Sequence, residues 1–129
     1  RISRTSETAS TYINDFHVRC QGTDDTAGSL SGGNQQKVSM AKVLADQPQV
    51  VILNEPTQGV DVGARQEIYS CIAELAKKGL AILLISSDMT ELLGLCKRIL
   101  VMREGRIADE VSGEKLTEQA IIRIATGTE

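Results

Sequence analysis

The segment at residues 30–34 combines side chains and backbone that could handle a phosphate group. It reads Leu30, Ser31, Gly32, Gly33 and Asn34, and it opens a stretch with helical spacing. Adjacent glycines let backbone N–H groups approach an anion closely, and the positive end of a helix dipole favours negative charge. The segment therefore predicts an anion site, although Ser-Gly-Gly alone also fits an ordinary helix cap.

A second segment places polar groups after an apolar run. Val50 to Leu53 reads as a buried parallel strand, and Asn54 and Glu55 follow it directly. A strand that delivers such groups at its carboxyl end is how α/β folds place chemistry. Glu55 could therefore carry chemistry at this strand end, or it could be a solvated loop carboxylate.

Two further positions stand next to elements that could present them. Asp61 precedes a stretch with helical spacing at 62–78, where it fits the N-cap. Ser87 follows the apolar run Leu80 to Ile85, which reads as a second buried strand. A serine hydroxyl can donate a hydrogen bond but cannot carry positive charge.

These segments must be positioned by alternating helices and strands. Hydrophobic spacing predicts helices over about 6–18, from 33 to near 47, 62–78, 89–95 and 117–125, and strands over 50–53, 80–85, 99–102 and 106–111. Glu104-Gly105 predicts a hairpin turn between the last two strands. The alternation predicts an α/β fold with a mainly parallel sheet.

Composition narrows the function classes. The sequence has 129 residues, 41% hydrophobic and 24% charged, which fits one compact domain. Its net charge of −3 leaves no basic surplus for nucleic-acid phosphates, so no nucleic-acid partner is expected. Three widely spaced cysteines predict free thiols, and a single histidine, His17, argues against a histidine-rich metal centre. No apolar run approaches the roughly 20 residues of a membrane helix.

Taken as whole strings, LSGGNQQKV at 30–38 and VVILNEPTQGVDVGA at 50–64 resemble the signature, Walker B and D-loop motifs of ATP-binding cassette (ABC) ATPases. The resemblance implies an incomplete P-loop NTPase domain with helices on both faces of the sheet. It also implies that Ser31, Gly32, Gly33 and Asn34 serve an ATP held mainly by an opposite cassette, since such cassettes dimerise head to tail around two ATPs.

The same resemblance assigns roles to the other positions. Glu55 stands where the family has its catalytic base, and Asp61 where a D-loop residue lies at the dimer interface. Asn54 replaces the usual Asp, so it implies a weak, water-mediated contact with Mg²⁺. Ser87 replaces a His that contacts the γ-phosphate in many cassettes. ATP and Mg²⁺ are the implied cofactors of the intact protein.

Three short segments of the sequence resemble one branch of the family. GNQQK, GVDVGA and Ser-Ser are similar to the second cassette of monosaccharide importers of the ribose, galactose and xylose type. The branch implies an ATPase at the cytoplasmic face of the membrane, whose partners are a second nucleotide-binding domain, membrane permease subunits and an extracytoplasmic sugar-binding protein. Two alternatives stay open: a degenerate cassette that binds nucleotide in a regulatory role, and a non-transport soluble ABC ATPase.

One family motif does not occur. The sequence contains no GxxxxGK[ST] phosphate-binding loop. The resemblance therefore covers only the C-terminal half of a cassette, with residues 1–33 as the end of the helical subdomain and 34–129 as part of the RecA-like core. We expect this piece alone to be inactive and to bind ATP weakly. We also expect exposed strand edges and apolar surface, which favour self-association.

Overall fold

The computed structural model describes residues 2–128, and the chain divides into two compact units, Arg1–Leu83 and Leu84–Glu129. The first unit contains α1 (Ile2–Asp15), the short 3₁₀ helix η1 (Ala27–Ser29), α2 (Gly32–Leu44), β1 (Val50–Asn54) and α3 (Val62–Lys77). Strand β2 (Ala81–Ile85) runs across the division. The second unit continues with α4 (Met89–Leu95), β3 (Arg98–Arg103), β4 (Arg106–Ser112), the 3₁₀ helix η2 (Gly113–Lys115) and α5 (Glu118–Thr126).

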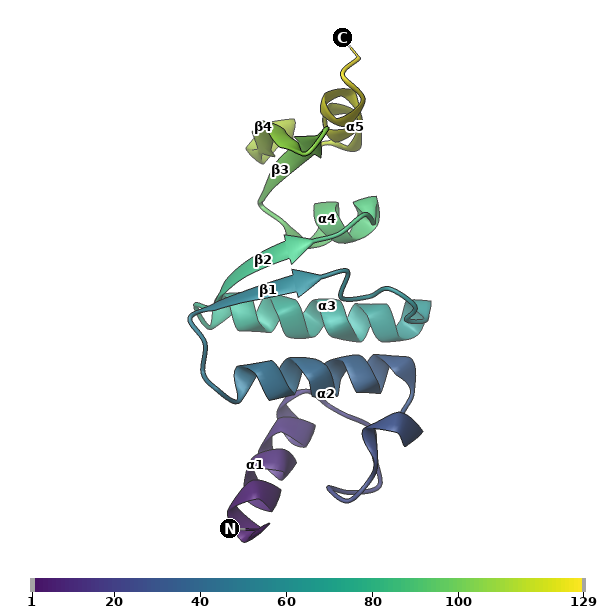
Figure 1. The fold of residues 1–129 in the computed structure, drawn as a ribbon, viewed down its shortest axis with the longest axis vertical. Helices are drawn as coiled ribbons and strands as arrows, with labels where there is room; N and C mark the ends of the chain where they lie inside the picture. The colour runs from purple at the N-terminus through teal and green to yellow at the C-terminus, as the bar shows by residue number, and fades with distance from the viewer. Residues whose placement is uncertain (1, 129) are drawn as a thin grey trace. The chain divides into compact units, whose positions relative to one another are not determined.

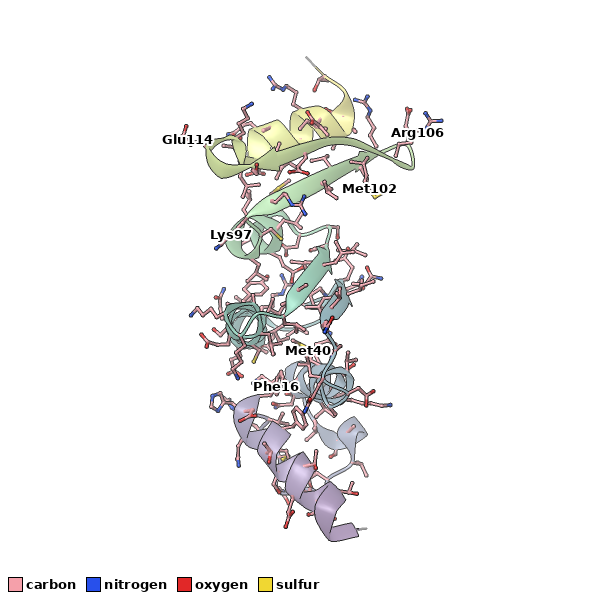
Figure 2. The ribbon with its side chains drawn as sticks, turned by 90° about the vertical axis from the view of Figure 1, so that its left-hand side faces the viewer. Phe16, Met40, Lys97, Met102, Arg106 and Glu114 are labelled. Atoms are coloured by element: carbon pink, nitrogen blue, oxygen red, sulfur yellow. The ribbon has the colours of Figure 1, made fainter. Side chains whose placement is uncertain are left out.

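Helices α2 and α3 lie side by side in the first unit, and the C-terminal end of α1 approaches α2 (Figure 1). The facing sides of α2 and α3 carry buried apolar residues, because the 3.6-residue period brings these positions to one stripe. Met40 on α2 and Phe16 just after α1 (Figure 2) are buried, as are Ile68 and Ile72 on α3. Buried residues outside the helices, such as Val60 in the loop before α3, extend this core.

Strands β1 and β2 pair in a two-stranded sheet and are joined through α3. A crossover of this kind makes the pair parallel, as predicted. The prediction that both strands are buried is wrong. Val51 is buried, whereas Val50 and Ile52 are 62% and 63% exposed. Strand β1 has exposed residues at every second position, and β2 alternates between exposed and half-buried residues, with Leu83 49% exposed.

The second unit is built on an antiparallel hairpin, with β3 paired to β4. Glu104 and Gly105 turn the chain with φ of 51° and 75°, the left-handed pair that a tight hairpin requires, so the predicted turn is confirmed. Helix α5 packs on the hairpin, and the core consists of four residues: Ile99, Val101, Val111 and Ile121.

The predicted helices are confirmed, with shifted ends at α1 and α2. Helix α1 spans residues 2–15 where 6–18 was expected, because His17 adopts a left-handed φ of 49° that ends the helix before it. Helix α2 stops at Leu44, short of the expected 47, where Gln47 is left-handed and Pro48 follows. Within residues 2–128, no helix combines the length and the apolar character that crossing a bilayer demands.

Candidate functional site

The predicted anion site forms a hydrogen-bonded turn at the start of α2. Ser31 is the N-cap residue, with an extended backbone, but its side chain makes no capping hydrogen bond to the helix. Instead the Nδ2 of Asn34 donates to the Ser31 Oγ over 2.9 Å. The Oδ1 of Asn34 accepts from the backbone N–H of Arg19, also over 2.9 Å. We call residues 30–34 the signature turn.

The two glycines of the signature turn lie against the segment that leads into α3. A Cβ atom at Gly33 would come within 2.6 Å of the Ala64 Cβ, and one at Gly32 within 3.8 Å of the Gly59 carbonyl oxygen. Glycine is therefore required at 33 for α2 and α3 to approach this closely. The structure thus brings the signature turn and residues 59–64, two of the predicted site segments, into contact.

Asp61 starts α3 as its N-cap. Its carboxylate accepts a hydrogen bond from the Ala64 backbone N–H over 3.0 Å, which satisfies one of the donors that a helix start leaves open. The predicted N-cap is confirmed. The role of Asp61 at a dimer interface stays a prediction, which its exposed position permits.

Glu55 follows β1 in an unusual backbone conformation. Its φ is 48°, in the left-handed region that a residue with a Cβ rarely adopts. The Gln58 N–H donates to the Glu55 carbonyl over 3.1 Å and closes the turn after the strand. Such backbone conformations cost roughly 1–3 kcal/mol. The catalytic role of the Glu55 carboxylate stays a prediction. Asn54, one residue earlier, is exposed.

Ser87 belongs to the second unit, where it lies exposed between β2 and α4. Its neighbours shape the start of α4: the Ser86 Oγ accepts from the Asp88 N–H over 3.0 Å. Asp88 is the N-cap and accepts from the Thr90 N–H over 2.9 Å. Ser87 is thus held at the end of a strand, as expected, and its phosphate contact stays a prediction.

An ionic cluster that the sequence motifs do not indicate lies beside the signature turn. Lys37 on α2 is 1% exposed, and its Nζ donates to Glu67 on α3 and, over 3.1 Å, to the His17 carbonyl. Arg19 reaches the other oxygen of Glu67 over 3.0 Å. The hydrogen bond from Lys37, reinforced by its charge, lowers the pKa of Glu67 below its usual 4.5.

One signal in the sequence could have identified this cluster. Lys37 lies on the same face of α2 as Gly33, Met40 and Ala41, which are all buried. A lysine within a buried stripe requires a partner, because an unpaired charge away from water is costly. Residue spacing indicates the stripe, but it does not indicate which acid on another helix supplies the partner.

The metal-binding potential of the described residues is small. Within residues 2–128 no three His, Cys, Asp or Glu side chains gather as metal ligands, and Asn54 offers only a neutral amide. The residues present therefore do not fit a Mg²⁺ site built from protein alone. The three cysteines are free thiols, as predicted, and burial raises the pKa of Cys71 and Cys96, which keeps them protonated and weakly nucleophilic.

An apolar cavity of about 800 Å³ lies between α1, α2 and the loop after α1. Its walls include Tyr12, Ile13, Val18 and Val38. It reaches Leu30 at the start of the signature turn, but none of the predicted phosphate-handling residues 31–34 lines it.

The fold that carries the glycine turn, the strand-end carboxylate and the N-capping aspartate is similar to about half of an ATP-binding cassette. The profile of the family described as ABC transporter matches residues 2–58. The structure is similar to MJ1267, an ATP-binding cassette of an ABC transporter, with 27% identity, a TM-score of 0.80, and coverage of 94% of this chain and 49% of that one. It is also similar to cbiO1 from Clostridium perfringens, with 26% identity, a TM-score of 0.76, and coverage of 99% and 51%.

Curated relatives are closer in sequence. The chain is 57% identical over 110 residues to a ribose import ATP-binding protein of Rhizobium meliloti, which covers 85% of the chain and 22% of that relative. It is 47% identical over 127 residues to a ribose import ATP-binding protein of Roseobacter denitrificans, covering 98% of the chain and 25% of that relative. The chain is similar to the ATP-binding proteins of ABC transporters, and it spans about a quarter of the length of these relatives.

Proposed function

We propose that this chain is part of the ATPase that drives monosaccharide uptake through an ABC importer. Its signature turn completes the pocket of an ATP held mainly by a second nucleotide-binding domain. The observation that carries the proposal is the close approach of Gly33 to Ala64, which holds the signature turn against the residues around Asp61. Backbone N–H groups at the start of α2 and the Ser31 hydroxyl then face the same solvent-accessible end of the helix, where an anion is favoured.

The proposed chemistry is the hydrolysis of ATP. Glu55 orients and deprotonates the attacking water, in a backbone conformation that its turn maintains. A Mg²⁺ ion that accompanies ATP would neutralise charge on its phosphates, and Asn54 would offer this ion a neutral carbonyl oxygen, through a bound water. Ser31, Gly32 and Gly33, with Asn34 in the same turn, serve the phosphates of the ATP held by the second nucleotide-binding domain. Asp61 contributes at the interface between the domains, and Ser87 contributes at the end of β2.

The sugar class follows from similarity to the ribose import ATP-binding proteins, and it sets the proposed partners. These are membrane permease subunits and an extracytoplasmic sugar-binding protein, with the ATPase bound to the cytoplasmic face of the membrane. We also propose the division of the chain into residues 1–33, as the end of a helical subdomain, and 34–129, as part of the ATPase core.

A second candidate function is supported by the neutral residues at two positions. With Asn54 and Ser87 in place of charged groups, the cassette could bind nucleotide and regulate its partner site without turnover of its own. The regulatory cassette would use the same signature turn as the importer ATPase. The two proposals differ only in whether Glu55 supports ATP hydrolysis.

The test replaces Glu55 in the protein that carries this chain at its natural full length, assembled with its permease. Glu55→Gln is expected to lower the turnover number by about a hundredfold or more, because a positioned general base contributes at least that factor, while ATP binding stays unchanged. Steady-state ATPase assays and equilibrium ATP binding measure the two quantities.

Glu104→Gln is the matched control, since Glu104 is also a left-handed glutamate in a turn, with φ of 51°. It is expected to leave turnover unchanged. An active wild type with unchanged turnover in Glu55→Gln contradicts the catalytic role and favours the regulatory cassette.

A further inference from the structure

We propose that Asn34 acts on the nucleotide through Ser31 and does not itself touch it. In this role Asn34 is a positioning residue, which turns the Ser31 hydroxyl so that its proton faces an incoming phosphate oxygen. The inference rests on the proposed function, because it assigns separate roles to Asn34 and Ser31 within the same signature turn. It also changes the role that the resemblance implied for Asn34, which was to serve ATP alongside Ser31, Gly32 and Gly33.

The hydrogen-bond partners of Asn34 determine which way its amide points. The backbone N–H of Arg19 can only donate, so the atom that faces it over 2.9 Å must be the Asn34 oxygen. The amide nitrogen then lies on the opposite side, 2.9 Å from the Ser31 Oγ. The orientation therefore follows from the chemistry of the two neighbours, which removes the usual ambiguity of an asparagine side chain.

This orientation determines the direction of the next hydrogen bond. An amide nitrogen can only donate, so the Ser31 oxygen is the acceptor and the proton of its hydroxyl remains for another acceptor. The Ser31 side chain makes no capping bond to the helix, so the Asn34 amide is the contact that orients it. A hydroxyl turned in this way is a ready donor to an anion at the start of α2.

The anchor of Asn34 is held by the ionic cluster. Lys37, which is buried, donates to the His17 carbonyl and to Glu67. It therefore holds the loop segment after α1 that contains Arg19. The Arg19 side chain also reaches Glu67, but it is 80% exposed and adds little by itself. A continuous path of contacts thus runs from α3 through Arg19 and Asn34 to the Ser31 hydroxyl.

The experiment is a double-mutant cycle in the full-length ATPase. Asn34→Ala, Ser31→Ala and the double variant are compared by single-turnover and steady-state ATP hydrolysis. Asn34→Ala is expected to lower kcat by about tenfold, the scale of one hydrogen bond, with the KM for ATP unchanged. In the Ser31→Ala background the same substitution is expected to cost nothing further, because the hydroxyl that it positions is gone.

Gln35→Ala is the matched control in the same turn. The Gln35 side-chain amide donates to the Leu30 carbonyl over 2.8 Å and makes no contact with Ser31, so its effect is expected to add to that of Ser31→Ala. Two results would overturn the inference. Asn34→Ala could cost the same factor in both backgrounds, or it could raise the KM for ATP and alter the preference for ATP over 2′-deoxy-ATP, and either indicates a direct contact with the nucleotide.

Failure of the proposed function gives a different pattern. A wild-type protein that hydrolyses no ATP overturns the ATPase proposal and this inference together. A wild type that hydrolyses ATP, with Ser31→Ala fully active, overturns the inference and the role of the signature turn while the ATPase activity stands.

Discussion

At the scale of single residues, the two positions at the end of β1 combine an acid and a neutral amide. Glu55 is partly buried with a left-handed φ of 48°, and Asn54 beside it is exposed. An amide oxygen interacts with Mg²⁺ more weakly than a carboxylate, since it lacks the charge that attracts a hard cation. The neutral residue at 54 is therefore expected to raise the Mg²⁺ concentration that ATPase activity requires.

Asn54→Asp tests this expectation. The added charge is expected to lower the Mg²⁺ concentration needed for half-maximal ATPase activity by several-fold, because one full charge is added beside the proposed metal contact. ATPase assays over a Mg²⁺ titration of the full-length protein measure it. Asn14→Asp, which adds the same charge on the exposed side of α1, is expected to leave the titration unchanged. Equal curves for all three proteins contradict a role for residue 54 near the metal.

At the scale of elements, the contact between α2 and α3 governs the site, because it joins the signature turn to the segment around Asp61. Two features hold the helices together: the absence of a side chain at Gly33 and the ion pair of Lys37 with Glu67. The first sets how closely the helices approach, and the second supplies a polar link within a mostly apolar contact. Each feature can be removed separately.

Gly33→Ala is expected to destabilise the fold by about 1–3 kcal/mol, the usual cost of overpacking. The new Cβ meets the Ala64 Cβ at 2.6 Å, so the clash outweighs the gain of about 1 kcal/mol that alanine brings to a helix. Urea unfolding measures the change. Gly94→Ala in α4 is the control: a Cβ there meets nothing within 4 Å, so that variant is expected to be as stable as the wild type or more stable. Adding Ala64→Gly to Gly33→Ala is expected to restore stability.

The Lys37–Glu67 pair predicts an asymmetry between two substitutions. Glu67→Met leaves the Lys37 ammonium buried without its acid and is expected to cost about 3 kcal/mol. Lys37→Met keeps the volume and leaves Glu67, whose side chain is 40% exposed, in contact with water, so about 1 kcal/mol or less is expected. Urea unfolding of the two variants compares these costs, and equal costs would contradict the assignment of Lys37 as the buried partner.

The same pair predicts a pH dependence. The pKa of Glu67 is lowered in the folded protein, so its contribution is present above the usual value of 4.5 and is lost as the pH falls through the lowered pKa. The wild type is therefore expected to lose stability below about pH 4.5 more steeply than Glu67→Met does. Parallel acid titrations of both proteins, followed by circular dichroism, measure the difference.

At the scale of the whole molecule, strong local patterns in the sequence predicted the elements well. The helix that begins after Asp61, the Glu104-Gly105 turn and the Ser31 helix start all depend on neighbouring residues, which a sequence displays directly. The burial of β1 and β2 was predicted wrongly, because it depends on what covers the sheet. Apolar runs such as Val50 to Leu53 carry no information on whether a second layer is present.

Some features of the candidate site could likewise be predicted from the sequence, and others depend on the fold. Motif residues could be located from the sequence, since Ser31, Glu55 and Asp61 lie in continuous strings. The interaction of Asn34 with Arg19 could not, because it joins residues from opposite sides of a loop. The pairing of Lys37 with Glu67 was missed for the same reason: only the packing of two helices brings these side chains together.

The hairpin and α5 of the second unit have a consequence for how the chain folds. The core residues Ile99, Val101, Val111 and Ile121 come from one short stretch of sequence, so only small loops must close to bring them together. Strands β1 and β2 are separated in sequence by the whole of α3, so a longer loop must close before they pair. The hairpin unit is therefore expected to nucleate early and independently, and the crossover that places Glu55 is expected to be completed later.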